Sequence, residues 1–435
     1  VLSPGAEPIN PFKGVKSDRI FTIRNVKDAE KVKTFIENNN PKSAVIVGGG
    51  YIGVEMAENL SEYTMEVSIV EKAPHLISII DNDMAHFIHK EIKKHGVKVY
   101  VNEGVNKIEE HEKLLLTLDN GKIETDLVIL CIGVRPETNL AEESGINTNE
   151  KGAIIVNNKM QTSNKDIYAL GDAVEVKNTI TGERNGIALA GPANRQARIV
   201  ANNINGIESS YEGFIGSSIL KIFNYSLGIV GLSERACKNL DIPYKIMIIS
   251  PYSHATYYPG AKMLTIKAIY NSKTSQILGA YVWGKSSVDK ITDILSVAIQ
   301  NKMGAADISA LELCYAPPYS SAKSPVNILG NAIENEMNEL VDTIAVEELK
   351  NKENLYILDV RTIEEYNISH IEGAINIPLD ELRENIEKLD KSKEIIVHCH
   401  SGLRSYLACR ILKQKGYNVK NLIGGYIMYD IMKNK

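Results

Sequence analysis

The sequence predicts an α/β protein with several domains, and three observations support this fold class. Residues 27–132 alternate strand-like and helix-like segments, which indicates a parallel sheet with crossover helices. A second alternation of the same kind begins near residue 341. Between them, residues 214–330 mix long apolar strands with helices, which is typical of an α+β domain. The 435 residues leave room for about three domains of ordinary size.

The elements of the first α/β segment follow a regular order. We expect, along the chain, a helix at 26–39, a strand at 43–48, a helix, a strand at 66–71, a helix and a strand at 97–101. Residues 114–126 then form a predicted hairpin, because Asn120-Gly121 between apolar runs signals a two-residue turn.

The later segments carry equally clear apolar runs. We expect strands at 264–270 and 277–284, a helix at 286–301, and short buried strands at 355–360, 394–399 and 419–425. The segment 331–344 separates the two groups. It could be a connecting helix, so the domain boundary is placed only within 331–345.

The net charge of −5, from 49 basic and 54 acidic residues, excludes a strong basic field over the molecule. We therefore expect no nucleic-acid partner. The longest apolar runs, such as residues 127–134, are too short to cross a bilayer, and no signal-peptide pattern opens the chain. We expect a cytoplasmic protein that does not bind membranes.

The cysteines argue against a disulfide framework and against a structural zinc site. Their number is odd, their spacing is irregular, and no Cys-x-x-Cys pair occurs. They are Cys131, Cys237, Cys314, Cys399 and Cys409. We expect no metal site, and any functional cysteine should act as a reactive thiol.

The strongest local motif is a glycine-rich turn between a predicted strand and a predicted helix. Gly48 permits the tight turn, Gly50 lets backbone N–H groups approach a pyrophosphate, and Gly53 allows close packing of helix on strand. Glu71 ends the next strand, where a carboxylate would bind an adenosine ribose and repel a 2′-phosphate. We expect NADH as the cofactor, with NADPH possible because Lys72 adjoins Glu71. The alternative is an ordinary glycine-rich turn.

A second signal is the short apolar strand that ends in Gly171-Asp172. By itself this is equally well an ordinary strand-to-helix turn with Asp172 as a helix cap. The order of the neighbouring segments, however, resembles the flavoprotein reductases with two dinucleotide-binding domains, the pyridine nucleotide-disulfide oxidoreductase family. The similar stretches are 2–8 (LSPGAEP), 132–138 (IGVRPET), 168–173 (YALGDA) and 189–204 (LAGPANRQARIVANNI).

This resemblance implies FAD beside NADH. It places Gly133, Gly171 and Asp172 around the flavin, with Asp172 holding the ribityl chain and Ala190 at the start of a helix beneath it. Glu55 would orient the nicotinamide amide, or it is simply a carboxylate on a helix face. Members of the family begin with their own FAD-binding glycine turn, followed in the disulfide reductases by a redox cysteine. Nothing here corresponds to either, so we expect a segment before Val1, an incomplete flavin site and no reductase activity from this fragment alone.

Two tyrosines point to a subfamily. The stretches 253–263 and 313–327 resemble the coenzyme A-disulfide reductases and their persulfide-reducing relatives. The resemblance implies a homodimer in which Tyr257 and Tyr315 reach the partner's active site, with CoA as substrate or bound ligand. The alternative is that both are packing aromatics. Two features depart from the pattern: Cys314, which we expect to be a small buried hydrophobe, and Ser324, which stands where an acidic residue is expected before Pro325.

The last segment carries a candidate nucleophile. Cys399 ends a buried strand and is followed by a loop to Arg404 and then by a helix. Backbone N–H groups and the positive end of that helix would stabilise a thiolate or a persulfide. Residues 339–435 resemble the rhodanese sulfurtransferases through this loop, 358–378 and 424–432. We treat Asp359, Arg361 and His370 in the flanking motif as supports of the loop, and Cys409 as a core residue.

The predicted fold is therefore a partial two-dinucleotide-binding-domain reductase with an α+β dimerisation domain and a C-terminal α/β rhodanese domain. The predicted parts are 1–26 and 134–213 (FAD domain), 27–133 (NAD(P) domain), 214–330 (dimerisation) and 339–435 (rhodanese). We expect an FAD-dependent NAD(P)H reductase of CoA disulfides or persulfides, coupled to sulfur transfer by Cys399 and Arg404, with small thiols, disulfides or persulfides as substrates. The alternatives are an NADH oxidase or peroxidase with an accessory rhodanese domain, and a persulfide carrier or interaction subunit without flavin chemistry.

Overall fold

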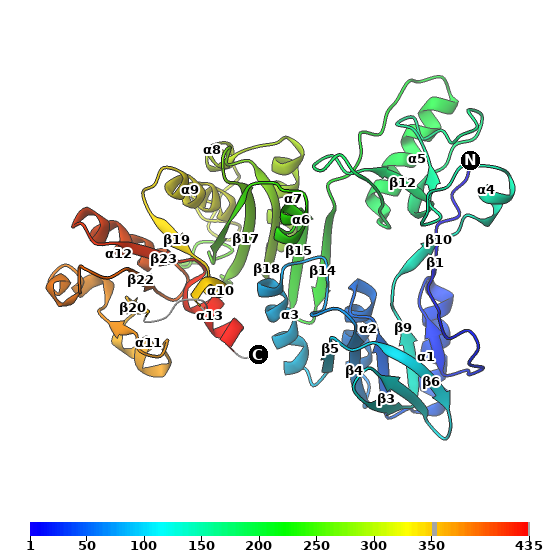
Figure 1. Ribbon diagram of the computed structural model, residues 1–435, viewed down its shortest axis with the longest axis horizontal. Coiled ribbons are helices and arrows are strands. Elements are labelled where there is room, and N and C mark those ends of the chain that lie inside the picture. The colour runs from blue at the N-terminus through cyan, green and yellow to red at the C-terminus, as the bar shows by residue number, and fades with distance from the viewer. Residues whose placement is uncertain (350–354, 434–435) are drawn as a thin grey trace. The chain divides into compact units, whose positions relative to one another are not determined.

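The computed structural model describes residues 1–349 and 355–433. The chain divides into two compact units, Val1–Gly216 and Ser217–Lys435. Figure 1 colours both along the chain. Among the described residues, no helix combines the length and the apolar character that a membrane crossing requires.

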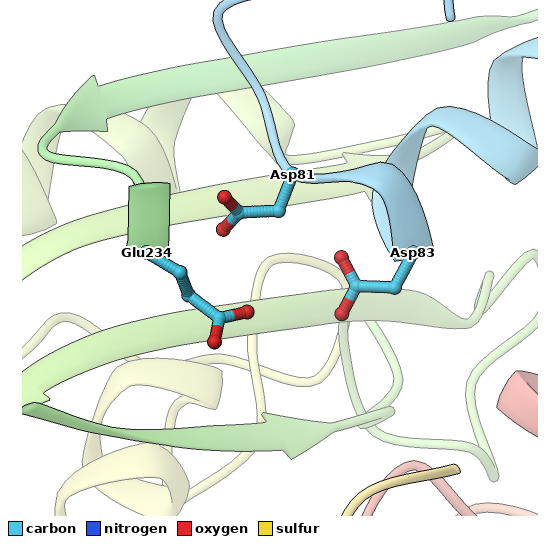
Figure 2. A group of neighbouring side chains, drawn as sticks. All are labelled: Asp81, Asp83 and Glu234. Atoms are coloured by element: carbon cyan, nitrogen blue, oxygen red, sulfur yellow. The ribbon is translucent and has the colours of Figure 1, made fainter. Parts of the chain in front are cut away.

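The first unit contains a parallel sheet in the order β2-β9-β3-β4-β5, which confirms the predicted α/β segment. Its central strands are buried on both faces, as parallel strands covered by helices usually are. The strands are β2 (Ile20–Thr22), β3 (Ser43–Val47), β4 (Glu66–Glu71), β5 (Lys98–Val101) and β9 (Leu127–Leu130), and the helices are α1 (Val26–Asn39), α2 (Tyr51–Ser61) and α3 (Asn82–Lys94). Figure 2 shows Asp81 directly before α3 and Asp83 in its first turn.

A small antiparallel sheet follows, formed by β6 (Val105–Glu110), β7 (Leu114–Leu118) and β8 (Lys122–Thr125). The predicted hairpin exists, but its turn differs from the expected one. Neither Asn120 nor Gly121 has a positive φ, and the Leu118 N–H donates to the Gly121 carbonyl at 2.8 Å. The two-residue loop is therefore Asp119-Asn120. The Asp119 carboxylate fixes it by accepting from the Gly104 N–H at 2.7 Å.

The rest of the first unit forms a lobe whose core includes residues from widely separated parts of the chain. Leu2 packs against a buried cluster that includes Ala169, Val174 and Val200. The lobe contains β1 (Ala6–Pro8), β10 (Val134–Pro136), β11 (Ile154–Ile155), β12 (Val174–Lys177), β13 (Arg184–Gly186), α4 (Asn139–Glu143), α5 (Ala190–Ile204) and the 3-10 turn Gly171–Ala173. Strand β1 pairs with β10, so the first residues and the residues after β9 lie in one lobe.

The second unit begins with an antiparallel sheet in the order β14-β15-β18-β17-β16. The predicted strands and helix of this segment are confirmed. The elements are β14 (Ser217–Ile222), β15 (Tyr225–Gly231), β16 (Tyr244–Ile249), β17 (Leu264–Asn271), β18 (Ile277–Gly284), α6 (Glu234–Asn239), α7 (Val288–Gln300), α8 (Ala305–Ser309) and α9 (Pro325–Met337). Glu234, also labelled in Figure 2, is the first residue of α6, and its carboxylate pairs with the buried Lys267.

The second sheet of this unit is parallel, in the order β19-β23-β22-β20-β21. Its three predicted buried strands are confirmed, and Cys409 lies in its core as expected. The elements are β19 (Asp342–Ile344), β20 (Tyr356–Asp359), β21 (Ile375–Asn376), β22 (Ile395–His398), β23 (Val419–Leu422), α10 (Val346–Leu349), α11 (Ile363–Ile368), α12 (Leu403–Gln414), α13 (Gly425–Lys433), η2 (Leu379–Glu381) and η3 (Ile386–Lys388). The segment 331–344 is not one helix, because α9 ends at Met337 and β19 begins at Asp342.

One buried carboxylate joins the two sheets of the second unit. Glu336 near the end of α9 accepts hydrogen bonds from Lys245 at 3.1 Å, from the Tyr270 hydroxyl at 2.5 Å and from Thr343 at 2.9 Å. Lys245 and Tyr270 belong to the antiparallel sheet, and Thr343 belongs to the parallel sheet. Burial and the charge of Glu336 raise the pKa of Tyr270. Glu336 therefore connects the two sheets through one buried acceptor.

Candidate active sites

The glycine-rich turn after β3 has two crowded positions and one open position. A Cβ on Gly48, whose φ is +105°, would lie 2.4 Å from the Cys131 carbonyl oxygen, and a Cβ on Gly53 would lie 2.0 Å from the Gly48 oxygen. By contrast, no described atom lies within 4 Å of the Cβ position of Gly50, at the N-terminus of α2. A helix N-terminus with open space beside it is suited to an incoming pyrophosphate. The turn therefore fits a dinucleotide.

Glu71 belongs to the same turn. One of its carboxylate oxygens accepts the Gly49 N–H and the other accepts the Ala73 N–H, both at 2.6 Å. Gly49 itself is a position that sequence reasoning missed. A Cβ there would lie 2.3 Å from Leu76 Cδ2 and 3.2 Å from the Cβ of Glu71, so the close approach of the turn to β4 requires it. Glu71 thus bonds the residue before Gly50, and its role with a ribose stays a prediction.

Glu55 lies one turn into α2, and its side chain is exposed. Partial desolvation by the surrounding protein, and then the negative charge of Glu58, raise the pKa of Glu55. It makes no hydrogen bond from its carboxylate to another described residue. The carboxylate is free to meet a ligand, and its role with nicotinamide stays a prediction.

The predicted flavin residues lie around the turn Gly171–Ala173. Gly171 has a φ of +81°, and its N–H donates to the buried Gln196 of α5 at 2.8 Å. Strand β10, which follows Gly133, and helix α5, which begins at Ala190, both contact this turn. Burial raises the pKa of Asp172, and no described residue donates a hydrogen bond to its carboxylate. A half-buried acceptor without a partner fits the hydroxyl groups of a flavin side chain.

The two candidate tyrosines meet in the structure. The hydroxyl groups of Tyr257 and Tyr315 lie 2.9 Å apart, although the residues are 58 positions apart in the sequence. Their side chains are 75% and 47% exposed, so they are not packing aromatics of the core. The hydrogen bond from Tyr315 is the main cause that raises the pKa of Tyr257. The pair presents two linked phenols at the surface of the second unit.

The two departures from the tyrosine pattern have different outcomes. Cys314 is exposed, so the expectation of a buried hydrophobe was wrong; the residue lies in a stretch without regular secondary structure. Ser324 is buried and caps α9: its hydroxyl accepts from the Asn327 N–H at 3.2 Å, and the Asn327 side chain accepts from the Ser324 N–H at 3.0 Å. A short hydroxyl residue before Pro325 is therefore explained by helix capping.

Cys399 lies in a cradle at the end of β22, and its side chain is buried. Its Sγ accepts the Gly402 N–H at 3.1 Å and the Ser405 hydroxyl at 3.5 Å. Gly402 has a φ of +104° and forms the N-terminal cap of α12, a conformation that favours glycine. Behind the sulfur, the Cys399 carbonyl accepts the Tyr426 N–H at 2.8 Å. Amide, hydroxyl and helix N-terminus thus converge on one sulfur atom.

A buried charge pair contacts Tyr426, whose N–H bonds the Cys399 carbonyl. Arg361 pairs with Asp359 at 2.6 Å and lies over the ring of Tyr426, 4.2 Å from its centroid. The Nε2 of His398 lies 3.5 Å from the same Asp359 carboxylate, but burial lowers the pKa of His398 to about 4. His370 stacks on Tyr366 with 4.0 Å between ring centroids. None of these groups bonds the sulfur, which agrees with a supporting role.

Arg404 binds an acid that sequence reasoning missed. Its guanidinium forms two hydrogen bonds, 2.6 and 2.7 Å long, with the two carboxylate oxygens of Glu365 in α11. This pair lowers the pKa of Glu365 to about 2, and Glu365, with a smaller contribution from Cys399, raises the pKa of Arg404. The only signal for Glu365 in the sequence was its place three residues after Thr362. An acidic residue at that place is expected in a helix capping box even if it pairs with no arginine.

Models of known families match almost the whole chain. Residues 1–197 match the model described as pyridine nucleotide-disulphide oxidoreductase, and residues 217–325 match the dimerisation domain of the same family. Residues 343–429 match the rhodanese-like domain. All of the candidate site residues named above lie within these three ranges.

Individual relatives cover most of the chain. An NADH oxidase of Methanocaldococcus jannaschii is 37% identical over 75% of this chain and 73% of its own length, and a coenzyme A disulfide reductase of Staphylococcus epidermidis is 34% identical over 76% and 74%. The crystal structure of reduced Bacillus anthracis CoADR-RHD has a TM-score of 0.93 at 42% identity, covering 99% of this chain and 78% of that one. An NAD-dependent persulfide reductase from A. fulgidus has a TM-score of 0.92 at 35% identity, covering 98% and 79%.

Proposed function

The chain belongs to the pyridine nucleotide-disulphide oxidoreductase family, and from this premise we propose that it is an FAD-dependent NAD(P)H reductase of CoA disulfides or CoA persulfides whose rhodanese-like domain transfers sulfane sulfur. The observation that carries the proposal is the Cys399 cradle, with Sγ 3.1 Å from the Gly402 N–H. A sulfur cradle in the same chain as a dinucleotide turn links reduction to sulfur chemistry. The relatives named as CoA disulfide reductase and persulfide reductase support this substrate class.

The residues of the first unit would hold the cofactors. The open side of Gly50 at the α2 N-terminus would receive the pyrophosphate of NAD(P)H, and Glu71 would accept hydrogen bonds from its ribose. Asp172, which has no described partner, would accept from a flavin hydroxyl, with α5 close beneath. When bound, the two cofactors supply the two-electron reduction of the disulfide.

The tyrosine pair would handle protons. A phenol whose pKa is raised stays protonated at neutral pH, so Tyr257 can donate a proton to a departing CoA thiolate, and Tyr315 holds its hydroxyl in place. The dimerisation-domain match supports a homodimer. In that homodimer the pair would serve the partner's site. All five cysteines are free thiols, which suits the cytoplasm, where we place the protein.

Cys399 would carry the sulfane sulfur. Its thiolate attacks the outer sulfur of a persulfide R–S–SH, the S–S bond of the donor breaks, and R–S⁻ leaves with the electron pair. The product is a persulfide on Cys399, whose negative form the Gly402 N–H and the α12 N-terminus stabilise. A second thiol can then take the sulfur from this position.

A second candidate function is an NADH oxidase, because the M. jannaschii relative bears that name. The two functions differ in the final electron acceptor. The test is NADH oxidation by the full-length protein loaded with FAD, with CoA disulfide, with CoA persulfide and with oxygen alone. The proposed reductase should turn over the sulfur substrates much faster than oxygen, and the reverse order would favour the oxidase.

The tyrosine pair gives the sharper version of this test. The double variant Tyr257→Phe, Tyr315→Phe should lose about 10²-fold or more in sulfur-substrate turnover, the usual effect of removing general acid catalysis. Stopped-flow reduction of the flavin by NADH should stay near the wild-type rate. Tyr319→Phe is the matched control, since it is an exposed tyrosine of the same segment. Unchanged turnover in the double variant would remove the tyrosines from the mechanism.

A further inference from the structure

The arginines near Cys399 are paired with carboxylates. The cations that act on the loop residue His400 are Arg361 and Arg404. Arg361 is paired with Asp359 at 2.6 Å, and Arg404 is paired with Glu365 through two hydrogen bonds. Burial lowers the pKa of His398 and of His400, so both imidazoles are neutral at pH 7. Each of these two arginines therefore already has a carboxylate partner.

What remains for a sulfur anion is modest. The Gly402 N–H and the Ser405 hydroxyl bond the sulfur directly, and the α12 N-terminus adds a partial positive charge of about one half. Arg404 also interacts with Cys399, but its interaction with Glu365 is the larger one. These groups suit one negative charge located on one atom. A donor that brings a second negative charge would need a cation, and the nearest guanidinium is held by Glu365.

We propose that Glu365 is a positioning residue that sets the donor class of Cys399: by holding Arg404, it makes the site favour persulfides over the dianion thiosulfate. The inference rests on the proposed sulfur transfer at Cys399 and specifies its donor. Glu365 and Arg404 are each one third exposed, so solvent reaches their pair.

The two donors place different demands on the site. With a persulfide, the Cys399 thiolate takes the outer sulfur and a singly charged thiolate R–S⁻ departs. With thiosulfate, the same attack on the outer sulfur breaks the S–S bond and releases sulfite, SO₃²⁻, with the electron pair, while Cys399 keeps the sulfur. The second reaction concentrates three negative charges near Cys399, and two of them leave together. A free arginine would stabilise them, but an arginine neutralised by Glu365 does so far less.

The fold allows a clean test of the Glu365 charge. Glu365 also caps α11, where its carboxylate accepts the Thr362 N–H at 3.0 Å and its own N–H donates to the Thr362 hydroxyl at 3.3 Å. Glutamine serves equally well at this position of a capping box. Glu365→Gln therefore removes the charge and keeps the helix cap. Glu364→Gln is the matched control, because the Glu364 carboxylate interacts with Thr362 and with its own backbone rather than with Arg404.

The experiment measures sulfur transfer to cyanide by the full chain, as thiocyanate formed, from thiosulfate and from 2-hydroxyethyl persulfide. The rate of Cys399→Ser is subtracted to remove the uncatalysed reaction. In the wild type, kcat/KM should be higher for the persulfide. Glu365→Gln should raise the ratio of thiosulfate to persulfide kcat/KM about tenfold, the scale of a close charge contact at a surface site. The ratio should return to the wild-type value in Glu365→Gln, Arg404→Gln, since the freed guanidinium is then gone.

An unchanged ratio in Glu365→Gln, or an equal change in Glu364→Gln, would overturn the inference while leaving sulfur transfer at Cys399 intact. Equal use of both donors by the wild type would overturn it as well. If neither donor transfers sulfur above the Cys399→Ser rate, the proposed sulfurtransferase function itself fails, and the inference fails with it. Thermal unfolding of each variant checks that the changes in ratio do not come from a loosened fold.

Discussion

The glycine turn after β3 and the cysteine loop after β22 use the same backbone device for opposite purposes. In each, a buried parallel strand ends, the chain turns, and the N-terminus of a helix faces the space beyond. At Gly50 that space is empty of described atoms. At Gly402 it is filled by the Sγ of Cys399. A helix N-terminus thus faces open space that suits an anionic ligand in one place and meets the protein's own sulfur atom in the other.

The acidic residues beside the two loops differ as well. Glu71 bonds two backbone amides and forms part of the turn itself. Glu365 bonds the side chain of Arg404 and cancels its charge. Glu71, which is hydrogen-bonded to the backbone, would shape its site for a neutral ribose. Glu365, which is paired with an arginine side chain, would change which charged ligands its site accepts.

Removing the sulfur atom of Cys399 should have the largest effect. Cys399→Ser should abolish sulfur transfer from a persulfide to cyanide, because the hydroxyl is a far weaker nucleophile than a thiolate and forms no persulfide. Cys314→Ser, at an exposed cysteine, should keep the wild-type rate and serves as the control. Thiocyanate formation by the full chain measures both. Full activity in Cys399→Ser would show that the cradle is not the site of transfer.

Two alanines should separate packing from ligand binding in the other loop. Gly53→Ala should lower the free energy of unfolding by about 1–3 kcal/mol, the usual cost of an overpacked site, because the new Cβ meets the Gly48 carbonyl at 2.0 Å. Gly50→Ala should leave that free energy nearly unchanged and weaken NADH binding about tenfold or more, since its Cβ enters the open space. Urea denaturation and NADH titration measure the two effects. Equal loss of stability in both variants would contradict the open space at Gly50.

The acid beside the turn should have a smaller effect on cofactor choice. The wild type should bind NADH more tightly than NADPH, because the carboxylate of Glu71 would meet the 2′-phosphate with like charge. Glu71→Gln should narrow this difference by about 1 kcal/mol, the scale of one close charge contact. Calorimetric titration with both nucleotides measures it. Equal wild-type affinities would indicate that the neighbouring Lys72 offsets the repulsion.

The smallest expected effect concerns pH and the support behind Cys399. Burial lowers the pKa of His398 to about 4, from an ordinary value near 6.5. Between these pH values the unfolded chain binds more protons than the folded one. The free energy of unfolding therefore has its full value above about pH 6.5 and falls as the pH is lowered toward 4, by about 1–3 kcal/mol for one group. NMR titration of the His398 ring should give a midpoint far below 6.5, and a normal midpoint would contradict the buried neutral imidazole.

The parts of the fold that the sequence predicts well are those set by local pattern. Continuous apolar runs identified β3 and β4 of one parallel sheet and β20, β22 and β23 of the other, because strands covered on both faces have little polar alternation. The short strands β2, β19 and β21 were not predicted. The predicted position of the hairpin turn was wrong. Gly104, which lies outside the hairpin, donates a hydrogen bond to Asp119, and this contact favours a turn at Asp119-Asn120 over one at Asn120-Gly121. The prediction that Cys314 is buried was wrong, because a stretch without regular secondary structure has no periodic pattern from which exposure can be predicted.

The candidate sites show the same limit. Cys399 and the glycine turn lie within single strand–loop–helix segments, so their chemistry follows from neighbouring residues. The hydroxyl contact of Tyr257 with Tyr315 spans 58 positions, and the pair of Glu365 with Arg404 spans 39. Contacts of this kind depend on how separate elements pack. Glu365 was missed for this reason, since its place three residues after Thr362 indicates no more than a helix cap.

The shared carboxylate of Glu336 bears on how such a protein can be assembled from existing parts. Its three donors come from both sheets of the second unit, and the Gly424 N–H adds a bond to the Ile248 carbonyl across the same join. A rhodanese-like module transplanted onto another carrier would need new acceptors for the Thr343 hydroxyl and the Gly424 amide. The carrier left behind would keep a buried acid beside Tyr270. Exchanging the rhodanese-like module therefore requires matched changes in both sheets. Two modules joined only by a flexible linker would need no such changes.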